Sequence, residues 1–185
     1  MKVFRIIGSQ DYWTIHYNNV VGIKNERYLA EFKGMPVAKD WKKIEAKVVF
    51  KGERSNIKPD IMDVGGLVGF AITSSAKDVL EDLLTPYCEL LPLDLEGEEI
   101  YLINPIIILD CLDYDNCVTK LYPPMYETKI VKYELKKGLR FPPIFRIKEE
   151  PSRSFSNYIT DEVVKVLQKN HIIGYDITEI WNSEE

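Results

Sequence analysis

The apolar residues of this chain fall into short runs separated by proline, glycine and asparagine, and this pattern restricts the fold more than any other feature. The longest apolar segment, residues 100–112, contains Asn104, Pro105 and Asp110. A membrane-spanning helix needs about 18 or more consecutive apolar residues, so none is predicted. Short β-branched and aromatic runs between turn signals are typical of β-strands. We therefore expect a protein built mainly from strands.

Two segments have the spacing of an amphipathic helix instead. Residues 76–84 carry apolar side chains three and four positions apart, and residues 161–169 repeat this spacing. Thr73, Ser74 or Ser75 can cap the first helix and Thr160 the second. The composition, with 45% apolar and 29% charged residues, is that of an ordinary globular protein. We predict an α+β fold that is β-rich and contains two short capped helices.

The residues around the two predicted helices form a weak internal repeat. The pattern ITxxAxxVL at residues 72–80 returns 87 positions later as ITxxVxxVL at residues 159–167. Two equivalent strand–helix–strand units would produce this pattern. Any capped junction between a strand and a helix would also converge on it. Both explanations fit the residues.

The length of 185 residues predicts one domain, or two small lobes that share a core. We expect residues 1–57 to form a β-rich N-terminal part of the same domain as the remaining residues. Residues 58–185 contain both predicted helices and should form its α+β region.

The cysteines indicate a reducing compartment. Cys88, Cys111 and Cys117 are odd in number and form no C-x-x-C pair, and the N-terminal residues lack the long apolar core of a signal peptide. We predict free thiols in a cytoplasmic protein. A catalytic cysteine would need a basic partner, and the only two histidines, His16 and His171, lie in no recognised motif.

No motif for a cofactor, a metal or a catalytic nucleophile is present. The chain lacks a phosphate-binding loop, a G-x-G-x-x-G loop, a G-x-S-x-G elbow and an H-E-x-x-H helix. Asp113 and Asp115 would share one face of an extended strand. A hard divalent cation needs more ligands than this pair and a glycine-containing loop. We predict no cofactor and no bound metal.

Acidic residues are concentrated in one part of the chain. Between Asp78 and Asp115 there are eleven acidic residues and no lysine or arginine, in a chain of net charge −5. Such a surface would repel nucleic acid and would suit a basic protein partner. A solvated face that only aids solubility is the alternative. The candidate partner-binding residues are Asp94, Glu96, Glu98, Glu99, Asp113 and Asp115.

Aromatic residues supply a second set of candidates for a protein interface. Tyr12, Trp13 and Tyr17 lie in one segment, and Tyr122 and Tyr126 lie in one predicted loop. Surface aromatics of this kind are enriched in protein interfaces, whereas most large aromatics pack in the core.

Six short blocks follow one another in the middle and C-terminal parts of the chain. They read FAITSSAKDVL from residue 70, ELLPL from 89, YLINP from 101, LDCLD from 109, IFRI from 144 and YITDE from 158. In this order, residues 58–180 resemble the immunity protein 11 family of bacterial polymorphic toxin systems. The resemblance implies an α+β protein that binds and neutralises a cognate toxin in the cytoplasm of the producing cell. It supplies no catalytic residues.

Two other classes of function stay open at this point. A small hydrolase or transferase would use Asp110, Asp113 or Cys111, and a deep pocket where carboxylates converge with His16 would favour it. A structural subunit of a larger assembly would be favoured by a large apolar surface patch.

Overall fold

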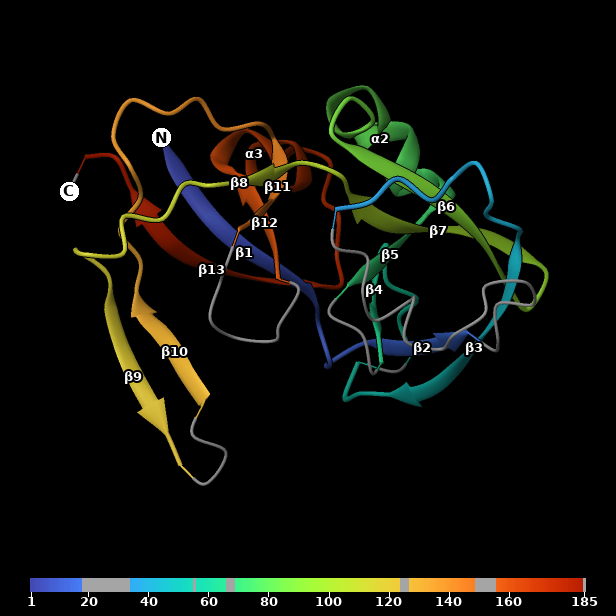
Figure 1. Cartoon of the computed structure of the whole chain (residues 1–185). Coiled ribbons are helices and arrows are strands. Elements are labelled where there is room, and N and C mark those ends of the chain that lie inside the picture. The colour runs from blue at the N-terminus through green and yellow to red at the C-terminus, as the bar shows by residue number, and fades with distance from the viewer. Residues whose placement is uncertain (18–33, 55, 66–68, 124–126, 149–155, 185) are drawn as a thin grey trace.

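The computed structural model describes the chain except for residues 18–33, 55, 66–68, 124–126, 149–155 and 185. Its described part is rich in strands and contains two helices, which confirms the predicted α+β class (Figure 1). The strands of residues 1–57 divide between the two larger sheets: β1 (Lys2–Gly8) lies in one, and β2 (Trp13–Tyr17) and β3 (Ile44–Lys51) lie in the other.

Six strands close into a small barrel. Around the barrel the order is β2, β3, β6 (Cys88–Leu95), β7 (Glu98–Pro105), β5 (Phe70–Thr73) and β4 (Ile61–Val64). The β2–β4 and β3–β6 contacts are parallel, and the other four are antiparallel. Alternate residues point inward, as the period of a strand requires. The interior is filled by apolar side chains that include Ile15, Met62, Ala71, Leu91, Leu93 and Leu102.

The second sheet has five strands in the order β13 (Tyr175–Asn182), β1, β12 (Asn157–Thr160), β11 (Ile144–Ile147) and β8 (Ile108–Leu109). One face carries a cluster of aromatic rings, with ring centroids 5.5 to 6.2 Å apart. The other face packs on the helices. Burial on both faces explains why β11 and β12 are buried at every position.

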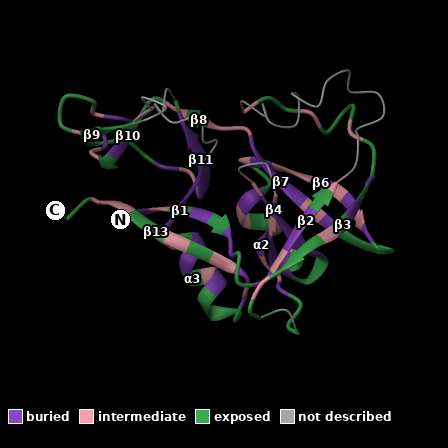
Figure 2. Cartoon of the chain, turned by 90° about the horizontal axis from the view of Figure 1, so that it is seen from below, coloured by how far each residue is buried: buried purple, intermediate pink, exposed green. Residues whose placement is uncertain are grey.

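The helices α2 (Ser74–Leu84) and α3 (Asp161–Lys169) share one core with the barrel and the five-stranded sheet. Leu80 and Leu84 of α2 and Val163 and Leu167 of α3 are buried in it. The outer faces of β5 and β7 and one face of β1 and β12 complete this core. Figure 2 shows α3 with buried and exposed positions on opposite sides, as its sequence spacing predicts.

The internal repeat corresponds to two units of the same topology. Strand β7 lies between β5 and β6 and is antiparallel to both, so β5 and β6 run parallel and α2 connects them. Strand β1 lies in the same way between β12 and β13, which α3 connects. Each unit is therefore a split β–α–β motif. The structure thus favours two equivalent strand–helix–strand units over the alternative that two unrelated capped helix N-termini converged on the same sequence pattern.

The two units differ at their helix caps. The Thr73 hydroxyl accepts a hydrogen bond from the Ala76 N–H at 3.3 Å. Thr160 occupies the same position before α3, but its hydroxyl is buried and has no hydrogen-bond partner among the described residues. The prediction that the Thr160 hydroxyl caps α3 is therefore wrong. Asp161 and Glu162 supply negative charge in the first turn of that helix instead.

The apolar run at 106–112 is only partly a strand. The run is long enough for a buried strand, but only Ile108–Leu109 forms one, paired with two residues of β11. Leu112 forms an isolated antiparallel bridge with Leu135. Cys111 and Leu112 are fully buried, in the core beside the aromatic face of the five-stranded sheet. Apolar residues that are buried outside a continuous strand give the same sequence signal as a strand.

The two strands that belong to neither larger sheet, β9 (Val118–Tyr122) and β10 (Glu127–Lys132), form a separate antiparallel ribbon. In Figure 1 the ribbon extends away from the five-stranded sheet at one end of the molecule. Hairpin β6–β7 lies at the opposite end in both views (Figures 1 and 2). We refer to β9 and β10 together as the ribbon.

Candidate functional site

Four of the six predicted partner-binding residues meet at the tip of hairpin β6–β7. Asp94 pairs with Glu99 across the hairpin, and Glu96 and Gly97 form its two-residue turn. Both turn residues have positive φ, 54° and 93°, as the tightest hairpin turns require. The turn is braced by the Gly97 N–H, which donates to Asp94 Oδ1 at 2.7 Å. We refer to Asp94, Glu96, Glu98 and Glu99 as the acidic hairpin.

The acidic hairpin is partly neutralised by lysines from other segments. Lys43 Nζ lies 3.1 Å from Glu99 Oε2 and 4.0 Å from Asp94 Oδ2. Lys58 forms an ion pair with Glu98. The hydroxyl of Tyr101 and then the Lys43 ammonium group lower the pKa of Glu99. In the part of the chain that the structure describes, Glu96 alone of the four has no ion pair. Segment 78–115 contains no lysine or arginine, but folding brings Lys43 and Lys58 from other segments to this hairpin.

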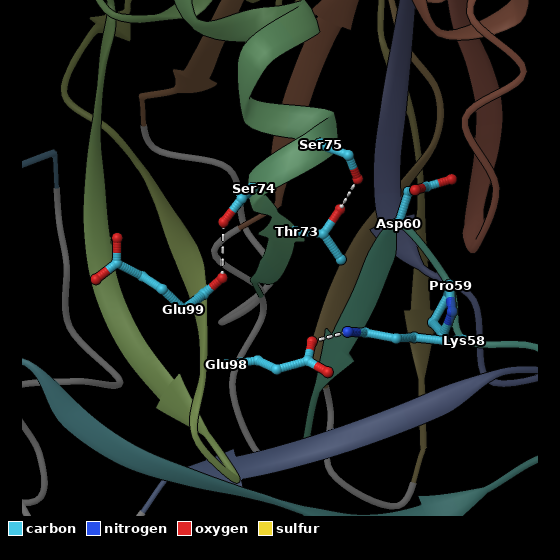
Figure 3. Close-up of a pocket in the computed structure, with 8 residues that line it drawn as sticks. All are labelled: Lys58, Pro59, Asp60, Thr73, Ser74, Ser75, Glu98 and Glu99. Atoms are coloured by element: carbon cyan, nitrogen blue, oxygen red, sulfur yellow. Dashed lines mark hydrogen bonds and ion pairs between the residues drawn. The ribbon is translucent and has the colours of Figure 1, made fainter.

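A pocket of about 380 Å³ lies beside the hairpin at the start of α2 (Figure 3). Its polar groups are already engaged with one another. The Ser74 hydroxyl donates to the Glu99 carbonyl oxygen at 3.0 Å, and the Ser75 and Thr73 hydroxyls lie 2.9 Å apart. Asp60 accepts a hydrogen bond from the Ile173 N–H at 3.0 Å. Each serine hydroxyl thus contacts a carbonyl or another hydroxyl, not a histidine or a carboxylate that could activate it.

The other two predicted residues lie in a turn at the far end of the molecule. The Asp113 carboxylate accepts a hydrogen bond from Asn116 Nδ2 at 2.9 Å, and its carbonyl accepts one from the Cys117 N–H at 3.0 Å. Asp115 is exposed in the same turn. Because these residues form a turn instead of a strand, the expectation that Asp113 and Asp115 share a strand face is wrong. They do not join the acidic hairpin.

The residues proposed for an enzyme do not converge. Asp110 is exposed and pairs with Lys136, whose ammonium group lowers the pKa of Asp110. Cys111 is fully buried, and burial raises its pKa to about 12. It is therefore an unreactive thiol at neutral pH, because the thiolate is the nucleophile. His16 lies on β2 of the barrel, away from these residues.

Sequence reasoning missed one cluster on the outside of the barrel. Asp63 of β4 lies opposite Thr14 of parallel strand β2, and the His16 ring packs over Gly65. A Cβ atom at residue 65 would lie 2.3 Å from His16 Nε2, so any larger residue there would displace the His16 ring. Burial raises the pKa of Asp63, while the Thr14 hydroxyl and the His16 ring oppose this shift. An acid inside a run of buried apolar residues is the signal that could have identified it.

Two of the polar residues in the family-like blocks are structural. The Glu89 carboxylate accepts hydrogen bonds from the N–H groups of Val37 and Ala38, at 2.8 and 3.0 Å. Asn104, which is fully buried, donates to the same carboxylate at 2.9 Å and to the Met35 carbonyl oxygen at 3.1 Å. This network holds the segment before β3 against β6 and β7.

The aromatic candidates divide into two groups. Tyr12 is buried, Trp13 and Tyr17 pack against the barrel core, and the Tyr17 hydroxyl is buried. The N-terminal aromatics are therefore core and rim residues, not an exposed cluster. Tyr122 lies on the ribbon and is exposed, and Tyr126 lies outside the described residues.

The ribbon exposes large apolar side chains. Val118, Leu121, Tyr122 and Val131 are between 40% and 52% exposed, and every residue of β9 is exposed. Among the described strands none pairs with either outer edge of the ribbon. A two-stranded ribbon is marginally stable by itself, and exposed apolar patches mark interaction sites. The ribbon therefore has features that are typical of a protein interface.

Comparison with known proteins adds no relative. No protein-family model matches the chain, and no curated protein matches it. The resemblance to the immunity protein 11 family therefore stays a prediction.

The three cysteines are free thiols, as predicted. Among the described residues, no helix has the length and apolar character needed to cross a membrane.

Proposed function

We propose that this protein neutralises a bacterial toxin by binding it, as the resemblance to the immunity protein 11 family implies, and that the toxin docks on the ribbon. The observation that carries this proposal is the set of exposed apolar side chains on a ribbon whose outer edges pair with no described strand. Neutralisation by occlusion of the toxin's active site needs no chemistry from the inhibitor. The site would then consist of a surface and not of a catalytic pocket.

Burial of the exposed aliphatic residues of the ribbon by a partner would contribute substantially to the binding affinity. Complete burial of one valine or leucine side chain contributes about 1.5–3 kcal/mol. Val118, Leu121 and Val131 are each about half exposed, so their burial by a partner would contribute about 3 kcal/mol in total. This corresponds to roughly a hundredfold in the dissociation constant.

The proposal is tested by co-expression with the product of the adjacent gene, scored for rescue of growth and for co-purification. The ribbon variant Leu121→Ser/Val131→Ser removes apolar surface from the ribbon. The matched control Ile57→Ser/Val49→Ser removes two similarly exposed aliphatic residues, 49% and 53% exposed, that lie outside the ribbon. We expect the ribbon variant to bind the toxin about tenfold more weakly and the control to bind normally. Thermal melting of both variants near the parent temperature would show that the folds are intact.

Growth rescue by the ribbon variant at the parent level, with unchanged affinity, would place the toxin on another surface. Absence of any rescue or co-purification by the parent protein would contradict the immunity function itself.

The same apolar ribbon favours a second candidate, a structural subunit of a larger assembly. In that case the ribbon would contact a second subunit in the absence of any toxin. Light scattering of the purified protein separates the two candidates. A concentration-dependent oligomer of the parent protein that is lost in Leu121→Ser/Val131→Ser would favour the subunit. A monomer in both the parent and the variant would favour the toxin-binding protein.

A further inference from the structure

Strand β9 has an outer edge that pairs with no strand among the described residues. Its described partner is β10, which in Figure 1 lies between β9 and the rest of the molecule. Every residue from Val118 to Tyr122 is exposed. The N–H and C=O groups of alternate residues in an edge strand point away from the neighbouring strand. The outer edge of β9 therefore offers main-chain donors and acceptors to another strand.

Other strand edges carry the features that usually prevent pairing, which are short length, charge and bulges. Strand β8, at one edge of the five-stranded sheet, has only two residues. Strand β13, at the other edge, carries Asp176 and Glu179 and has a register shift against β1. In the ribbon itself the register shift lies in β10, between Ile130 and Lys132. Strand β9 is regular over five residues, lacks proline and carries a single charge, on Lys120.

The single charge of β9 decides which kind of strand can pair with its outer edge. Lys120 is the central residue of the five. If a second copy of this chain paired along all five residues, in parallel or antiparallel orientation, Lys120 would lie directly opposite the same lysine of that copy. Like charges at directly opposite positions destabilise a sheet. The edge is therefore guarded against a second copy, but it is open to a strand with a neutral or acidic side chain at that position.

The side chains of β9 alternate between the two faces of the ribbon. Val118, Lys120 and Tyr122 lie on one face, where Lys120 Nζ is 5.3 Å from the centroid of the Tyr122 ring. Glu127 and Lys129 of β10 lie opposite Tyr122 and Lys120 on this face, so the ribbon carries charges of both signs there. The other two residues of β9 lie on the opposite face. A third strand would therefore be held mainly by main-chain hydrogen bonds and by side-chain contacts on both faces.

We propose that the toxin adds an extended segment to the outer edge of β9, as a third strand of the ribbon, with a neutral or acidic side chain opposite Lys120. This inference rests on the proposed function, because it names the way in which the toxin binds the ribbon. A two-stranded ribbon is marginally stable by itself, and a third strand stabilises it. Main-chain pairing of this kind supplies affinity, and the side chains on the two faces supply specificity.

Hydrogen exchange of the β9 amides tests this pairing. It is measured by NMR for the protein alone and for the protein bound to an inactivated product of the adjacent gene. We expect alternate amides of residues 118–122 to exchange at least about tenfold more slowly in the complex, because those that face outward gain a hydrogen bond. The amides between them already face β10 and should change less. The amides of β13, the long edge strand of the five-stranded sheet, are the internal control and should not change.

The outcomes separate this inference from the proposed function. If the gene product binds but leaves the β9 amides unchanged, the immunity function stands and strand addition is wrong. If the gene product does not bind at all, the proposed function fails and this inference fails with it. If the β9 amides are slowed in the concentrated protein alone, and light scattering then shows a dimer, the edge pairs with a second copy and the inference is overturned.

The role of Lys120 is tested without the toxin. Lys120→Val removes the charge from the centre of β9 and should produce a concentration-dependent dimer in light scattering. Lys129→Val is the matched control, because it removes the same charge from the opposite position of β10 and should stay monomeric like the parent. Equal self-association of both variants, or none in either, would show that Lys120 does not guard the edge and would overturn the assignment of this edge to the toxin.

Discussion

At the scale of single residues, Asp63 shows how a half-buried carboxylate costs stability. It lies on the outer face of β4, beside Thr14 and His16, and burial is the main cause of its raised pKa. A raised pKa means that the folded protein holds this proton more tightly than the unfolded chain, whose carboxyl group titrates near 3.8. The free energy of unfolding therefore decreases as the pH rises from this value through the folded pKa.

We predict that Asp63→Asn reduces this pH dependence. The amide keeps the size of the side chain and can still contact Thr14, but it does not ionise. Urea midpoints measured between about pH 4 and pH 7 should decline less with rising pH in the variant than in the parent. Asp78→Asn, at an exposed position of α2, is the matched control and should follow the parent. Parallel curves for Asp63→Asn and the parent would show that the Asp63 carboxylate is adequately solvated.

At the scale of elements, the two split β–α–β units provide an internal comparison. Thr73 and Thr160 are equivalent residues, at the junction of β5 with α2 and of β12 with α3. Only the Thr73 hydroxyl accepts a bond from a helix N–H, whereas the Thr160 hydroxyl is buried without a partner among the described residues. The sequence offers Thr73, Ser74 or Ser75 for the first cap and Thr160 for the second, but not which hydroxyl is used, because that depends on the exact placement of each side chain.

We predict that the two isosteric changes Thr73→Val and Thr160→Val have different effects. Thr73→Val removes a helix cap and should lower the free energy of unfolding by about 0.5–2 kcal/mol. Thr160→Val replaces an unpaired buried hydroxyl by a methyl group and should leave stability unchanged or raise it. Denaturant unfolding of both variants checks this. Equal losses would mean that Thr160 forms a cap bond in solution.

At the scale of the whole molecule, folding redistributes the charge that the sequence concentrates in one segment. The acidic hairpin recruits Lys43, which precedes β3, and Lys58, which precedes β4. The parallel pairing of β3 with β6 places Glu45 opposite Asp94 and so brings Lys43 to the hairpin. At the base of the ribbon, Lys132, Lys136 and Lys137 line a pocket together with Asp113 and Glu134. The role of the acidic hairpin in partner binding stays a prediction.

We predict that Glu96→Asn changes the rate of association with the toxin by less than about twofold at low salt. Glu96 is the one hairpin acid without an ion pair among the described residues, and its φ of 54° suits asparagine better than glutamate. The fold should therefore be retained or slightly stabilised. Stopped-flow association over a range of salt concentrations measures the effect. A markedly slower association would show that the hairpin steers a basic partner after all.

The local elements were accessible from the sequence. Residues 161–169 were predicted as a helix with the bounds that α3 has, because side-chain period and caps act over a few neighbouring positions. The four residues of strand β4 are too few for a period to show in the sequence. The apolar run at 106–112 forms a strand over only two residues, because burial alone does not require a continuous strand.

The class of fold and the two helices therefore follow from the sequence alone. Three features depend on the packing of distant segments: Lys43 pairs with Glu99, Asp113 and Asp115 lie apart from the acidic hairpin, and the ribbon is exposed. The physical reason is distance along the chain. Local structure depends on a few adjacent residues, whereas ion pairing and exposure depend on contacts between segments that only closure of the barrel and packing of the five-stranded sheet bring together.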